Sequence, residues 1–61
     1  METNVWYFDD RNAVINTIEE IKDKFPCFVT VEDLELDWIE VTIKARTEDI
    51  GTIETMLARF A

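Results

Sequence analysis

The densest group of chemically active side chains lies in residues 32–40, which contain no Lys or Arg. Its carboxylates are Glu32, Asp33, Glu35, Asp37 and Glu40. Carboxylates this close together can bind a metal ion, exchange protons as a general acid and base, or meet the basic surface of a partner. The remaining residue types of the chain discriminate among these three uses.

A calcium site is the first possibility, because Asp33-x-Glu35-x-Asp37 resembles the first three ligand positions of an EF-hand loop. The sixth position of such a loop requires Gly and here is Trp38, and the twelfth requires Glu and here is Lys44. The match fails at both positions. We therefore expect no metal site and no cofactor.

Catalytic chemistry is also disfavoured by composition. The chain contains no His and no Ser, which excludes Ser-His-Asp triads, and it has a single cysteine, Cys27, without a second thiol for an internal disulfide. Two carboxylates can act as acid and base, but 61 residues rarely enclose the pocket that this requires. We expect a protein that is not an enzyme, has no catalytic residues and keeps Cys27 as a buried structural thiol.

Binding to a basic partner is the remaining use of the acidic segment. In an extended strand Asp33, Glu35 and Asp37 would project from one face about 6.7 Å apart, which imitates the repeated charge of a nucleic-acid backbone. Trp38 would add a large apolar anchor. The predicted partner-binding surface consists of Glu32, Asp33, Glu35, Asp37, Trp38 and Glu40. The alternative is that these carboxylates only keep a small sheet soluble.

Hydrophobic periodicity predicts the elements that position this segment. An apolar, aromatic run at residues 5–8 predicts a strand, Asp9 or Asp10 caps a helix, and Pro26 ends that helix. A period of two over residues 27–46 predicts two strands joined somewhere within residues 32–38. Thr47 is then expected to cap a last helix, whose apolar stripe is Ile50, Ile53, Leu57 and Phe60.

The expected fold is a single α+β domain over residues 1–61, a two-layer sandwich of order βαββα with two helices on one face of a three-stranded antiparallel sheet. It resembles a ferredoxin-like unit without its final strand, and this resemblance implies that the first strand lies at an edge. That strand contains Val5, Trp6, Tyr7 and Phe8 and has neither Lys nor Pro to block pairing. We therefore expect self-association through it, as a homodimer.

The formal charge of −8 disfavours direct binding to nucleic acid or to an anionic membrane. The N-terminal residues lack the features of a signal peptide, and no apolar stretch is long enough to span a bilayer, so we expect a cytoplasmic location.

Two resemblances bear on function. The length, acidity and lack of catalytic residues are similar to those of small inhibitors and adaptors that phages and mobile elements express, which implies an inhibitor or adaptor that occupies a basic nucleic-acid-binding surface of a host protein. Residues 48–53 resemble the Asp-x-Gly turn of ACT regulatory domains, which implies as an alternative a small-molecule-sensing module with a site near Gly51. A purely structural, oligomerising subunit is the third possibility.

Overall fold

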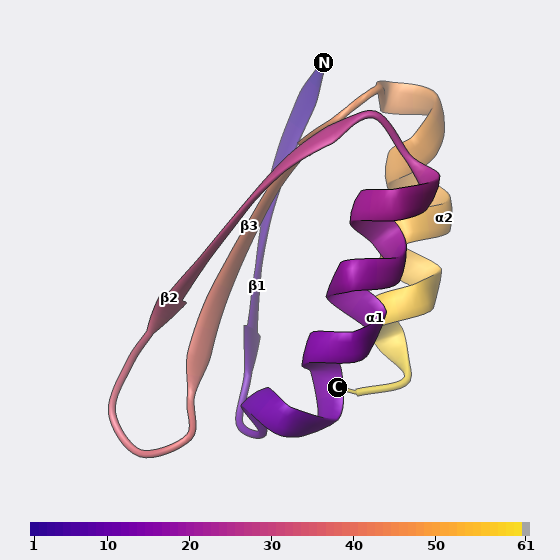
Figure 1. Ribbon diagram of the computed structural model, residues 1–61. Helices are drawn as coiled ribbons and strands as arrows, with labels where there is room; N and C mark the ends of the chain where they lie inside the picture. Colours follow the sequence, from indigo (N-terminus) through magenta and orange to yellow (C-terminus); the bar gives the residue numbers. More distant parts are fainter. Residues whose placement is uncertain (61) are drawn as a thin grey trace.

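A three-stranded antiparallel sheet is covered on one face by two helices (Figure 1). The computed structural model describes residues 1–60. Its elements follow the order β1 (Glu2–Phe8), α1 (Arg11–Lys24), β2 (Cys27–Asp33), β3 (Ile39–Ala45) and α2 (Thr47–Ala58). The predicted α+β domain with three antiparallel strands and two helices is confirmed.

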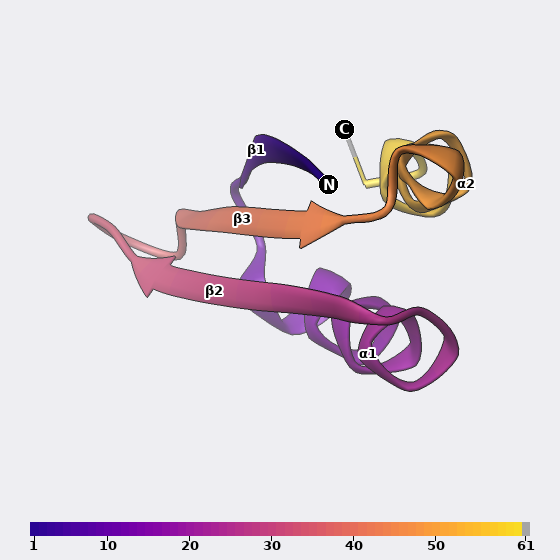
Figure 2. The ribbon, with the colours of Figure 1, turned by 90° about the horizontal axis from the view of Figure 1, so that it is seen from above.

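The sheet order is β1-β3-β2, so β3 is central and pairs with antiparallel neighbours on both sides (Figure 2). The aromatic strand β1 lies at one edge, as expected, and β2 forms the other edge. Because side chains alternate along a strand, each row across the sheet shares one face. The odd-numbered residues of β3 face the helices, and the even-numbered residues lie on the uncovered face.

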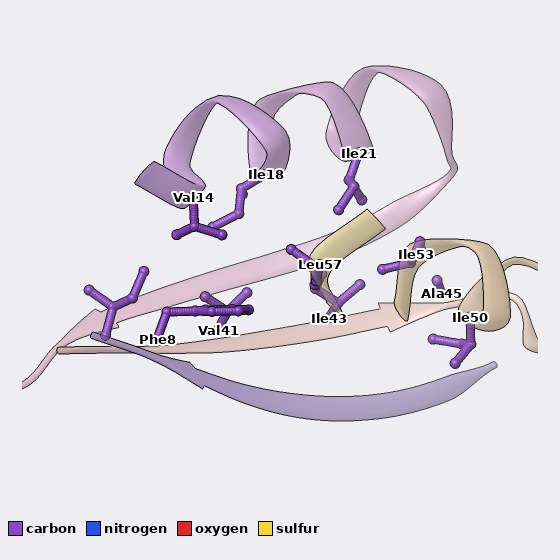
Figure 3. Packing of buried hydrophobic residues seen from close by; sticks show 11 residues of the cluster. Phe8, Val14, Ile18, Ile21, Val41, Ile43, Ala45, Ile50, Ile53 and Leu57 are labelled. Atoms are coloured by element: carbon purple, nitrogen blue, oxygen red, sulfur yellow. The ribbon is translucent and has the colours of Figure 1, made fainter. Parts of the chain in front are cut away.

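The hydrophobic core fills the space between the sheet and the two helices (Figure 3). The central strand is the floor of this core, because all its helix-facing side chains are buried. Both helices contribute the apolar stripe expected from a period of 3.6 residues. The buried cluster consists of Phe8, Val14, Ile18, Ile21, Ile39, Val41, Ile43, Ala45, Ile50, Ile53 and Leu57.

Helix α1 begins where the sequence predicts. Asp10 is the N-cap, and its carboxylate accepts a hydrogen bond of 3.2 Å from the backbone N–H of Ala13. This bond satisfies one of the N–H groups that have no partner within the helix. The helix ends at Lys24, two residues before Pro26.

Asp10→Ala is expected to lower the free energy of unfolding by about 0.5 to 2 kcal/mol, because the cap bond is lost. Asp9→Ala is the matched control, since it removes the same charge next to the cap but makes no cap bond in the structure. Urea denaturation of both variants measures the difference. Equal losses in the two variants would contradict the assignment of the cap to Asp10.

Helix α2 begins differently from the prediction. Its N-cap is Arg46 and not Thr47, because Thr47 is already helical and the N–H groups of Asp49 and Ile50 donate to the carbonyl of Arg46. The Arg46 side chain makes no cap bond. Its Nε instead donates to Oδ2 of Asp49 at 2.7 Å, which pairs the nearly buried carboxylate of the first turn.

Candidate functional site

The connection between β2 and β3 is a five-residue loop, residues 34–38, which we call the hairpin tip (lower left in Figure 1). The N–H of Leu34 donates to the carbonyl of Trp38 at 2.8 Å, and the N–H of Trp38 donates to the carbonyl of Glu35 at 3.2 Å. Leu36 has a φ of 59°, the only positive φ among the described non-glycine residues. The loop lies within the predicted limits, although it lacks the glycine that usually occupies such a conformation.

The structure contradicts the expectation that Asp33, Glu35 and Asp37 line one face of an extended strand. Asp33 is the last residue of β2, whereas the other two lie in the turn, where strand alternation no longer applies. Asp33 is opposite Ile39, whose side chain belongs to the helix-covered face, and pairs with Arg11 at 3.3 Å. The predicted partner-binding set is therefore divided, and Asp33 is the member that has a cation beside it.

Glu32 and Glu40 lie directly opposite each other on the uncovered face of the sheet. Like charges in this position destabilise a strand pair. The hydroxyl of Tyr7, which is the next residue across the sheet, donates a hydrogen bond of 2.8 Å to Oε2 of Glu40. A row of one phenol and two carboxylates thus crosses all three strands beside the hairpin tip.

The pKa of Tyr7 is raised above its usual 10.0, first by the hydrogen bond to Glu40 and then by the negative charge of Glu40. Because folding favours the protonated phenol, this contribution to stability is fully present below pH 10.0 and is lost as the pH rises through the folded pKa. Tyr7 is the only tyrosine, so its titration can be followed by ultraviolet absorbance.

Glu40→Gln is expected to lower the pKa of Tyr7 toward 10.0, because the charge that disfavours the tyrosinate is removed. Glu2→Gln removes the same charge at the opposite end of the sheet and is expected to leave the titration unchanged. A pKa of Tyr7 that is the same with and without the Glu40 charge would show that the contact does not form in solution.

The hairpin tip exposes three apolar side chains between its carboxylates. Leu36 is 93% exposed, Trp38 is 44% exposed and Leu34 is 41% exposed, while Glu35 and Asp37 are also exposed. Trp38 was predicted from the sequence as part of the binding surface, whereas Leu36 was not. Leu36 could have been found from the alternation of apolar and acidic residues in this segment. Its apolar residues are at even-numbered positions, whereas the helix-facing apolar residues of β2 and β3 are at odd-numbered positions.

The uncovered side of the sheet, which we call the open face, carries three residues from each strand. Tyr7 lies on it, whereas the neighbouring Trp6 and Phe8 point toward the helix-covered side, where Phe8 is buried and Trp6 packs against the core. Phe28 is also on the open face and is 70% exposed. Its members are Thr3, Val5, Tyr7, Phe28, Thr30, Glu32, Glu40, Thr42 and Lys44.

Charge is distributed unevenly along the domain, whose principal extents are 33 × 18 × 17 Å. The end formed by the hairpin tip and the start of α1 contains half of the fourteen carboxylates: Asp9, Asp10, Glu32, Asp33, Glu35, Asp37 and Glu40. Four of the six cations, Lys22, Lys24, Lys44 and Arg46, lie toward the opposite end of the sheet, where β3 and α1 finish, whereas Arg11 lies at the hairpin end and pairs with Asp33. A basic partner would therefore be attracted to the hairpin end.

Cys27 is only partly buried, and its Sγ lies 3.9 Å from the carbonyl oxygen of Ile21. Burial raises the pKa of the thiol above 9.0, which keeps it protonated at neutral pH. Within residues 1–60 the structure contains no pocket and no group of three or more metal-ligating side chains. In the same range no helix is long and apolar enough to cross a membrane.

Residues 48–53, which resemble an ACT turn in sequence, lie inside α2 and form no turn. Gly51 is exposed on that helix, and a Cβ added to it would meet no other atom within 4 Å. In the structure this segment is therefore part of helix α2. Comparisons with known protein families, with curated proteins and with solved structures gave no match.

Proposed function

We propose that this domain is a protein-binding module, an inhibitor or adaptor without enzymatic activity, whose hairpin tip occupies a basic nucleic-acid-binding surface of another protein. We also propose that its fold is a ferredoxin-like unit without the final strand. The predicted binding set is revised in two respects: Leu36 joins it, and Asp33 leaves it because its carboxylate pairs with Arg11.

The observation that carries the proposal is the conformation and exposure of Leu36. A left-handed backbone costs an L-residue about 1 to 2 kcal/mol, and Gly or Asn would avoid most of this cost. Leu36 accepts this conformation and leaves its side chain 93% exposed, so it contributes nothing to the core. Backbone strain clusters at ligand-binding and switch regions, and a partner that covered Leu36 would remove its apolar surface from water.

The electrostatic part of the proposal rests on the carboxylates around the tip. Glu35 and Asp37 flank Leu36, and the opposed pair Glu32 and Glu40 lies where the two strands enter the loop. None of these four makes an ion pair within residues 1–60. Arg or Lys side chains of a partner would relieve their mutual repulsion, which gives both attraction over distance and orientation at contact.

The experiment that tests this function uses the immobilised domain to retain proteins from a cell lysate at low ionic strength. The expected result is retention of nucleic-acid-binding proteins that duplex DNA elutes at constant ionic strength, because DNA and the hairpin tip compete for one surface. A parallel column carries the variant with Glu35→Lys and Asp37→Lys. Retained proteins that resist DNA and bind both columns equally would overturn the proposal.

A further inference from the structure

The open face of the sheet has a charge pattern that the single chain does not satisfy. Lys44 stands between Thr3 and Phe28 in one row across the face, and no carboxylate lies within ion-pair distance of it in residues 1–60. Glu40 and Glu32 form the acidic row of the same face, four residues along the strand, which is about 13 Å away. The row between them, Val5, Thr42 and Thr30, is uncharged.

We infer that the open face binds a second copy of this chain, with Lys44 of each copy against Glu40 of the other. A two-fold axis that runs across the strands through the row of Val5, Thr42 and Thr30 produces this arrangement. It places the row that contains Lys44 in each copy over the row that contains Glu40 in the other copy. Thr42 of one copy faces Thr42 of the other at the axis. The interface goes beyond the function proposed for the hairpin tip and does not depend on it.

Charge complementarity selects this orientation over the other two-fold packing of aligned strands. An axis parallel to the strands would place Lys44 on Lys44 and Glu40 on Glu40, which repel each other. In the selected orientation each contact occurs twice, because the interface is isologous. Tyr7 assists by holding the Glu40 carboxylate through its 2.8 Å hydrogen bond.

The side chains around the ion pairs are suited to packing between two sheets. Val5 is 48% exposed, Tyr7 57% and Phe28 70%, and the threonines of the middle row are uncharged and β-branched. Three strands about 4.8 Å apart and seven residues long cover roughly 350 Å² in projection. This is less than the ~800 Å² per partner of a stable complex. The dimer is therefore weak, concentration-dependent and sensitive to salt.

Sedimentation equilibrium over a wide range of protein concentration tests the inference through a charge swap. Lys44→Glu and Glu40→Lys are each expected to weaken dimerisation at least about tenfold, because each creates two like-charge contacts. The double variant restores the complementary pairs and is expected to dimerise within about threefold of the original chain. Circular dichroism verifies that each variant is folded, which we expect because both side chains lie outside the core.

Two variants distinguish this interface from a general effect of net charge on association. Glu40→Lys lowers the net negative charge, so general repulsion predicts stronger association, whereas the inferred interface predicts weaker association. Lys22→Glu, on α1 and away from the open face, has the same net charge as Lys44→Glu and is expected to leave the dimer intact. Association that ignores the charge swap, as pairing through the β1 edge would, overturns the inference, and so does a chain that stays monomeric at millimolar concentration.

Discussion

Ile43→Ala is expected to lower the free energy of unfolding by about 2 to 5 kcal/mol, because it leaves a cavity under both helices. Ile43 is fully buried and lies in the central strand, where Asn4 and Val29 are its neighbours across the sheet. Figure 3 shows its side chain beside Leu57 of α2. A domain of this length has a total stability of only about 3 to 9 kcal/mol. The substitution therefore removes a large fraction of it.

Thermal denaturation measures this loss, and we expect the melting temperature to fall by on the order of 10 to 30 °C. Thr30→Ala is the control, because it also shortens a strand side chain but lies on the exposed open face. Its expected cost is below about 1 kcal/mol. Similar losses for the two variants would mean that the core is not organised between β3 and the helices.

The hairpin variants are expected to produce the largest change in binding. Reversing the charge of Glu35 and Asp37 together should weaken capture of a basic partner at least about thirtyfold, the effect of a 2 kcal/mol hot spot. Much of this loss should appear as slower association, because the variant repels the cationic surface that the original attracts. Surface plasmon resonance with a protein identified on the column separates the two rates.

Leu36 allows the apolar contribution to be tested apart from charge. Leu36→Asn removes the apolar side chain and suits the left-handed backbone, so stability should stay constant or rise slightly while binding falls at least about tenfold. Leu36→Met keeps an apolar side chain of similar volume and should retain binding. Unchanged binding of the Asn variant would remove Leu36 from the binding surface, and with it the main support for the proposed function.

The pattern of apolar residues along the chain was sufficient to predict the strands, the helices and the core. A period of two in residues 39–45 assigned the buried side of β3, and a period of 3.6 did the same for both helices. These properties depend on neighbours in sequence. The helix caps were predicted less well. Asp10 was one of two predicted candidates for the first cap, and the cap predicted at Thr47 lies one residue earlier, at Arg46.

The candidate site depended on contacts that no local pattern encodes. The turn at residues 34–38 has no glycine, so the sequence located the connection only to within residues 32–38 and did not show which carboxylates leave the strand. The strand register placed Glu40 between Glu32 and Tyr7. The start of α1 placed Arg11 beside Asp33, although Asp33 lies 22 positions later in the chain. Composition and periodicity thus determined which residues are acidic, apolar or buried. Only the tertiary structure decided which carboxylates are paired and which remain exposed, because charge pairing depends on distances between residues far apart in sequence.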